Sequence, residues 1–374
     1  MSASLRHILP ILLLLLPPAI ACAEDAPVPP EPIPDAGATA PLVLDPAATD
    51  PTLQPAPAAE PATNPAAPVD AFAKPPAPDA VNAAEFTGEP LPEGLSALTM
   101  KLQILLDEIG ASPGVIDGIN GRNVAKAIGA AEVMMGLPVD GILDAEVWRR
   151  LPKDTPILVG YTITDADVAG PFLGTVPTDY AEMAKLDSLA YANPLEMFGE
   201  RFHMDVDLLK ALNPGVDFGV AGSQIVVAAA NTYAVLTKVA RIVADKRNAQ
   251  LLAYAADGTL VAAYPATIGS SELPSPSGTH LVNGVARNAA YYYRPKVNFQ
   301  QGNNTERLTI PPGPNNPIGT TWIDLSEPTY GIHGTPEPSR IDKTNSHGCV
   351  RLTNWDVEEL ANLVHFGVPV EFIE

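Results

Sequence analysis

A single cysteine near the C-terminus lies among residues that could activate it. The run SHGCVRL at residues 346–352 places His347 two residues before Cys349, across a glycine. A second His-Gly pair, His333-Gly334, stands a short distance upstream. The thiolate is the reactive form of cysteine, and a neighbouring imidazole is a common means of forming one near neutral pH. These residues predict a cysteine nucleophile with a histidine base.

The N-terminus predicts export. Residues 1–23 contain a short basic start, an apolar run at 8–16 and the small residues Ala21-Cys22-Ala23, the layout of a cleaved signal peptide. The apolar run is too short to span a membrane as a helix. Cys22 either leaves with the signal or carries a lipid. Simple export is favoured, because residues 19–21 match a lipoprotein signal poorly.

The cysteine count supports a working role for Cys349. The chain has two cysteines, so export leaves Cys349 as the one available thiol in a compartment where disulfides form. An unpaired cysteine is a liability there unless it has a function. The opposite interpretation is that Cys349 is only a small packing residue.

Composition divides the chain and excludes one class of partner. Residues 24–92 are dominated by proline, alanine and acidic residues, a composition that predicts a disordered linker. The formal net charge of the 374 residues is -21, which argues against nucleic-acid binding because that requires a basic face.

Two small modules are expected between the linker and the C-terminal part. Residues 93–152 predict three helices separated by two Asp-Gly turns, and this layout resembles the peptidoglycan-binding-like domain. Residues 158–229 predict strand, helix, helix, strand, which resembles a LysM module, a family that recognises N-acetylglucosamine chains. The section between the first strand and the first helix is longer than that family usually shows.

The C-terminal part, residues 231–374, predicts mainly β structure. Apolar runs at 251–255 and 260–264 flank Asp257-Gly258, a strong hairpin signal. After the cysteine, a helix is expected to begin at Thr353 and to end at Gly367, before a final strand. His280 and His365 are expected to be structural. The tyrosine run 291–293 is expected in the core or lining a cleft.

The motifs of this part together resemble the catalytic domain of the L,D-transpeptidases, the YkuD-type family. The marks, in chain order, are Thr267-Ile268-Gly269, PSPSGTH, GPNNPIGT, GIHGT and SHGCVRL. The resemblance implies a multidomain protein in which a mainly-β sandwich with a C-terminal helix follows an α+β LysM-like module and a helical bundle. It covers the whole of residues 231–374.

The resemblance also implies a role for each site residue. Cys349 would be the nucleophile, His333 its general base, and the Gly334 carbonyl would orient the imidazole. His347 would tune the thiol, and backbone N–H groups around His347, Gly348 and Cys349 would form an oxyanion hole. Ser346 and Arg351 are assigned to substrate binding. Arg351 suits either a substrate carboxylate or the fixing of its own loop.

The implied activity is a two-step acyl transfer on peptidoglycan in the periplasm, with cell-wall assembly and cell shape as its setting. Cys349 would form a thioester with the diaminopimelate carbonyl of a tetrapeptide stem, release D-alanine, and pass the acyl group to an amine to give 3-3 crosslinks. Water as acceptor would give a carboxypeptidase, and a lipoprotein lysine would give an anchoring enzyme. Carbapenem-type β-lactams are expected inhibitors, and no metal or nucleotide is needed.

Two further interpretations remain open from the sequence. His333, His347 and Cys349 are all zinc-ligand types, although no fourth ligand stands at a recognisable spacing. Alternatively, the chain is a non-catalytic wall-binding protein that keeps the remains of an enzyme domain.

Overall fold

The computed structural model describes residues 71–374, except 155–156, 230–236, 270–273, 298 and 345–347. The predicted signal peptide, Cys22, Ser346 and His347 lie outside the described residues. In the described part of the chain, no helix is both long enough and apolar enough to cross a membrane.

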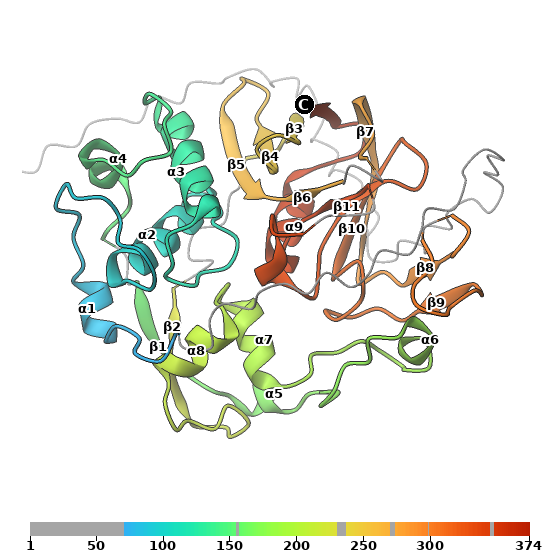
Figure 1. Cartoon of the computed structure of the whole chain (residues 1–374), viewed down its shortest axis with the longest axis horizontal. Coiled ribbons are helices and arrows are strands. Elements are labelled where there is room, and N and C mark those ends of the chain that lie inside the picture. Colours follow the sequence, from blue (N-terminus) through green and yellow to red (C-terminus); the bar gives the residue numbers. More distant parts are fainter. Residues whose placement is uncertain (1–70, 155–156, 230–236, 270–273, 298, 345–347) are drawn as a thin grey trace, which may run out of the picture. The chain divides into compact units, whose positions relative to one another are not determined.

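A helical module opens the described part (Figure 1). The Ser96 side chain caps the second of its helices by accepting a hydrogen bond from the Thr99 N–H at 3.0 Å. Gly136, in a left-handed conformation with φ of 66°, ends the third. The helices are α1 (Pro78–Asn82), α2 (Ala97–Glu108), α3 (Arg122–Met135) and α4 (Ala145–Arg150).

The linker ends earlier than the composition predicts. Residues 78–82 form a helix in which Val81 is fully buried, so the expected disorder up to residue 92 is wrong for this stretch. The Asn82 side chain forms two hydrogen bonds with the backbone of Leu158, accepting from its N–H at 2.9 Å and donating to its carbonyl at 3.2 Å. A single apolar residue and one amide were too weak a signal against the surrounding prolines and alanines.

Next come two strands and two helices in the predicted order. The strands β1 (Leu158–Thr162) and β2 (Gln224–Ala228) pair antiparallel, and between them run α7 (Pro194–Arg201) and α8 (Val206–Leu212). The resemblance to LysM stays a prediction. We call residues 158–228 the LysM-like module.

The long section that separates β1 from α7 is ordered and reaches the C-terminal domain. It contains α5 (Asp165–Val168) and α6 (Tyr180–Met183). Met183 and Leu189 share a small buried cluster with the hairpin formed by β8 (Tyr291–Tyr293) and β9 (Leu308–Ile310). In Figure 1, α6 lies beside that hairpin. We call residues 165–193 the insertion.

The C-terminal domain is built on one sheet of nine strands. Its order is β5-β4-β3-β13-β7-β10-β11-β12-β6. Most neighbours pair antiparallel, but β13 with β3 and β11 with β12 are parallel. The strands are β3 (Arg241–Asp245), β4 (Gln250–Tyr254), β5 (Leu260–Pro265), β6 (Thr267–Ile268), β7 (Gly278–Arg287), β10 (Thr321–Leu325), β11 (Gly331–His333), β12 (Val350–Arg351) and β13 (Pro369–Ile373).

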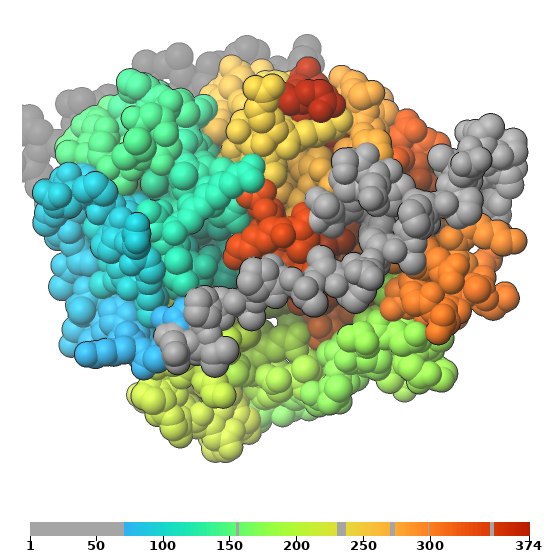
Figure 2. Space-filling model, viewed as in Figure 1, coloured from blue at the N-terminus to red at the C-terminus, as the bar shows by residue number. Residues whose placement is uncertain are grey.

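The two ends of this sheet must meet. Strands β5 and β6 lie at opposite ends of the strand order, yet only Ala266 separates them in the chain. The sheet is therefore rolled, and the edges of β5 and β6 form a seam. Helix α3 packs against β5 at this seam, and in Figure 2 the green-to-teal surface of the helical module directly adjoins the yellow surface of the β4–β5 hairpin. Covering an edge in this way removes exposed backbone groups.

One helix closes the domain and departs slightly from expectation. Helix α9 (Asn354–Leu363) begins at Thr353, whose side chain accepts from the Asp356 N–H, and it packs on β10 and β11. The predicted end at Gly367 is wrong, because Val364 already has an extended conformation. His365 therefore follows the helix and is exposed. The apolar stripe alone could not show where the backbone turned. The predicted fold class, a mainly-β domain after a helical bundle, is confirmed.

Candidate active site

Strand β11 places His333 in the interior of the sheet. Its neighbours are β10 and β12, which puts Trp322 on one side of His333 and Arg351 on the other. The imidazole is 5% exposed and stacks on the Trp322 ring, with 5.6 Å between ring centres and 17° between planes. The stacked ring fixes the plane in which the imidazole nitrogens point.

The protonation of His333 follows from its hydrogen bond. Nδ1 lies 2.7 Å from the Gly334 carbonyl oxygen. Because a carbonyl only accepts, Nδ1 carries the proton and Nε2 is left with a lone pair. Burial, together with the nearby charge of Arg351, lowers the pKa of His333 to about 3. At neutral pH the imidazole is uncharged and able to accept a proton.

Gly334 is a site where no side chain fits. A Cβ there would overlap the Asn354 Oδ1 atom. The Asn354 amide nitrogen in turn donates to both Glu200 oxygens, at 2.8 and 3.1 Å. The tight packing under Gly334 thus joins the histidine loop to α9 and to the LysM-like module.

Cys349 immediately precedes β12, the strand that pairs with the strand of His333. Its Sγ lies 3.8 Å from the Thr329 carbonyl oxygen, and the side chain is half-buried. Burial raises the pKa of the thiol to about 11, although a hydrogen bond from the Gly331 N–H and the charge of Arg351 both act to lower it. The resting cysteine is therefore a neutral thiol.

Gly348 shapes the backbone next to the nucleophile. Its φ is +103°, which side-chain-bearing residues rarely adopt, and a Cβ there would lie 2.7 Å from the Tyr330 ring. The buried hydroxyl of Ser275 donates to the Gly348 carbonyl at 2.6 Å. Ser275 belongs to the PSPSGTH motif, so the loop that contains this motif fixes the backbone next to Cys349.

Arg351 is a cation with spare hydrogen-bonding capacity. Its Nε is buried and has no hydrogen-bond partner among the described residues. No carboxylate in the described part of the chain forms an ion pair with it. A guanidinium offers a planar fork that matches a carboxylate.

The sequence interpretation missed Tyr180, which the insertion delivers to this region. Its ring packs edge-on against Tyr291, Tyr293 and Phe299, with centres 5.1 to 6.2 Å apart. Burial raises the pKa of Tyr180 to about 12, opposed by the charge of Arg351. The unusual length of the insertion was the available signal. Of the tyrosine run, Tyr293 is fully buried and Tyr292 is 44% exposed.

The remaining predicted residues separate into two groups. Ser346 and His347 lie outside the described residues. His280 is on β7, where its ring contacts Phe372 and its Nε2 is 3.1 Å from the Ser277 carbonyl oxygen. Among the described residues, no three His, Cys, Asp or Glu side chains form a group suited to a metal ion.

Fold and site define the class of protein: a rolled β domain in which a neutral, backbone-oriented histidine lies on one strand and a cysteine immediately precedes the neighbouring strand. Residues 239–372 match the L,D-transpeptidase catalytic domain family, YkuD, and residues 96–151 match a putative peptidoglycan binding domain. The chain is 32% identical over 178 residues to a putative L,D-transpeptidase YkuD of Bacillus licheniformis, covering 47% of this chain and 91% of the relative. The chain belongs to the L,D-transpeptidase family.

The chain is also similar to a second curated transpeptidase and to a solved structure. A probable L,D-transpeptidase YbiS of Escherichia coli is 27% identical over 226 residues, which are 58% of this chain and 72% of that one. An L,D-transpeptidase structure from Mycobacterium smegmatis is 19% identical, with a TM-score of 0.30, over 41% of this chain and 64% of that chain. The predicted transpeptidase and peptidoglycan-binding families are confirmed by the two family matches.

Proposed function

We propose that the protein is an exported, cysteine-dependent L,D-transpeptidase that makes 3-3 crosslinks in peptidoglycan. The observation that carries the proposal is the state of His333, which is neutral, buried and oriented by the Gly334 carbonyl. It lies on the strand paired with the one that Cys349 precedes. A base must be unprotonated and held in place before it can take a thiol proton.

The chemistry starts from a neutral pair. Cys349 Sγ attacks the diaminopimelate carbonyl of a tetrapeptide stem while His333 Nε2 takes the thiol proton. The C–N bond to D-alanine breaks, and the departing amine receives that proton. The product of this half-reaction is a thioester on Cys349.

The second half-reaction restores the enzyme. An acceptor amine attacks the thioester carbonyl, and His333 takes the amine proton. The C–S bond breaks, and the sulfur leaves as a thiolate that His333 reprotonates. The acceptor is then joined to the stem by an amide bond.

Arg351 supports the proposal as the group that binds the donor stem. It is a half-buried cation near the nucleophile, and its Nε has no hydrogen-bond partner among the residues that the structure describes. The stem carries free carboxylates. Burial lowers the pKa of the Arg351 guanidinium, and the charges of Tyr180 and Glu337 act to raise it. Neither neutralises it with a direct ion pair in the described structure. A substrate carboxylate would satisfy both the charge and the free donor.

A groove on the LysM-like module supports attachment to glycan strands. It encloses about 540 Å³ between the start of α7 and the loop after α8. Ligand sites of this size combine apolar side chains with a few polar groups, and the lining of the groove has both kinds. Its lining is Asn193, Pro194, Leu195, Lys210, Asn213, Gly215, Val216, Asp217, Phe218 and Gly219.

The direct test is incubation of the purified protein with disaccharide-tetrapeptide, followed by mass analysis with and without an acceptor amine. We expect loss of D-alanine and a crosslinked dimer, and we expect Cys349→Ala to abolish both while the circular dichroism spectrum is unchanged. Undiminished crosslinking by that variant would sink the proposal. Tripeptide alone would indicate a carboxypeptidase, and product formed only with a lipoprotein lysine would indicate an anchoring enzyme.

Two cheaper measurements address the remaining alternatives. Labelling of Cys349 by a carbapenem would rule out a non-catalytic wall-binding protein. Fractionation should place the mature chain in the periplasm with the cell wall. Recovery in the membrane fraction would contradict simple export and would favour a lipid on Cys22.

A further inference from the structure

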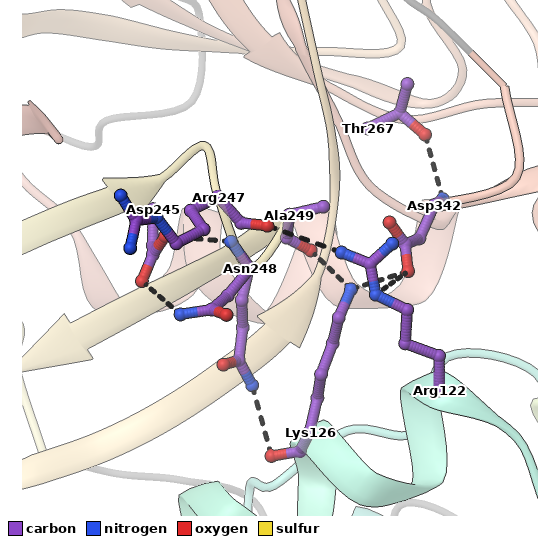
Figure 3. Close-up of polar contacts among 9 residues, drawn as sticks. Arg122, Lys126, Asp245, Arg247, Asn248, Ala249, Thr267 and Asp342 are labelled. Carbon is purple, nitrogen blue, oxygen red and sulfur yellow. Dashed lines mark hydrogen bonds and ion pairs between the residues drawn. The ribbon is translucent and has the colours of Figure 1, made fainter. Parts of the chain in front are cut away.

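The helical module contacts the C-terminal domain through a buried lysine. Lys126 lies on α3, and its side chain is 8% exposed. Its Nζ donates to the Asp342 carboxylate at 2.6 Å and to the Ala249 carbonyl at 3.0 Å. Figure 3 shows both bonds converging on the ammonium group. A lysine is rarely buried unless paired, so this pair is a specific feature of the packing.

Asp342 belongs to the segment that leads from the histidine to the cysteine. It lies nine residues after His333 and seven before Cys349. Its side chain is 7% exposed, and its φ of +61° is left-handed. A non-glycine residue keeps such a conformation only where its surroundings hold it.

The backbone of Asp342 connects the lysine to the strands of the site. The Asp342 N–H donates to the Thr267 hydroxyl at 3.0 Å. Thr267 is on β6 and pairs with Arg351 of β12. Strand β12 begins at Val350, directly after Cys349. A chain of three contacts, two hydrogen bonds and one strand pairing, thus runs from α3 through Asp342 and β6 to β12, the strand that follows Cys349.

The other acceptor of Lys126 belongs to the far end of the rolled sheet. Ala249, in the turn between β3 and β4, also has a left-handed φ, of 48°. The Gln250 amide donates back to the Lys126 carbonyl at 3.3 Å. Lys126 therefore holds two left-handed residues, one on each side of the seam between β5 and β6.

We propose that Lys126 is a positioning residue for the reaction, which holds Asp342 and through it β6 and the paired strand β12 that directly follows Cys349. The inference rests on the proposed function for its kinetic readout. It gives the helical module, which matches a putative peptidoglycan binding domain, a role in supporting the active site.

Arg122 supplies the matched comparison on the same helix. Its Nε is 3.5 Å from the same Asp342 oxygen, but its side chain is 61% exposed. Exposed ion pairs contribute little, whereas loss of one partner of a buried pair leaves an uncompensated charge. Removal of Arg122 should therefore leave Asp342 in place, and removal of Lys126 should release it.

The test compares Lys126→Met, Asp342→Asn and the double variant with Arg122→Met in the full chain. We expect kcat for transfer from disaccharide-tetrapeptide to fall about tenfold in the first three, with KM within about twofold, because small misplacements of a reacting group affect the chemical step strongly. Alkylation of Cys349 by iodoacetamide at pH 8 should become about tenfold faster, because water entering the site relieves the burial that raises the thiol pKa. Arg122→Met should change neither rate by more than about twofold.

These opposite changes separate positioning from general stability. All rates are measured at least about 15 °C below each variant's melting temperature, so that every variant is folded during the assay. A destabilising substitution lowers the melting temperature by an amount of this order. If Lys126→Met does not fold, the double variant, which leaves no unpaired charge, decides the matter. A folded variant without the pair that keeps both rates within twofold of wild type overturns the proposal, as does an equal loss in Arg122→Met. If the wild type transfers nothing, the proposed function fails, and the alkylation rate still decides the role of Lys126.

Discussion

The resting ionisation of Cys349 provides the sharpest test of the site. Burial raises the thiol pKa to about 11. The ordinary pKa of a cysteine on the same scale is 9.0, so at pH 7.5 the thiolate of Cys349 should be about 100-fold scarcer than that of an unperturbed cysteine. About one molecule in three thousand would carry the thiolate. His333, with its pKa lowered to about 3, cannot supply the positive charge that a stable ion pair requires.

The assay is alkylation of the purified protein by iodoacetamide between pH 6 and 10, followed by intact-mass analysis. We expect the rate to rise about tenfold per pH unit without a plateau, since only the thiolate reacts. Release of D-alanine in the first half-reaction should stay nearly flat over the same range, because His333 is already unprotonated. His333→Asn should lower crosslinking by about 10²- to 10⁴-fold, the usual contribution of a general base, and leave alkylation almost unchanged. A plateau in the alkylation rate below pH 8 would refute this reasoning and would indicate a thiolate–imidazolium pair.

Three further changes test the supports of the site. Gly334→Ala should place a methyl group against Asn354 and lower the free energy of unfolding by about 1–3 kcal/mol, measured by urea unfolding. Gly160→Ala, where a Cβ would meet nothing and φ is not left-handed, serves as a control for the added methyl group. Burial raises the pKa of Glu200 to about 8, so its neutral form stabilises the fold at low pH and that contribution disappears as pH rises toward 8. Glu200→Gln should therefore flatten the fall in melting temperature between pH 5 and 8. An unchanged slope would contradict the raised pKa of Glu200. Arg351→Gln should raise KM for the tetrapeptide about tenfold through loss of one charged pair, whereas an unchanged KM would assign Arg351 to its own loop.

The sequence by itself determined the elements and the reactive residues. The hairpin at Asp257-Gly258, the Thr353 cap and helices α2, α3 and α4 follow from local patterns, because turns and caps depend on residues within a few positions of each other. The His333-Gly334 pair and Cys349 were equally visible, because the chemistry of a nucleophile and its base depends on residue type. The predicted end of the linker was wrong only at α1, a short helix whose Asn82 is held by contacts with the distant residue Leu158.

Only the tertiary structure decided how those residues behave. The pKa values of His333 and Cys349 come from burial between neighbouring strands, and no local pattern states which strands pair. The rolled sheet brings β5 and β6 together, and that seam is what Lys126 covers. Tyr180 reaches the site from a section more than a hundred residues upstream of Tyr291. These contacts join residues far apart in the chain, and the sequence carries no local signal for them.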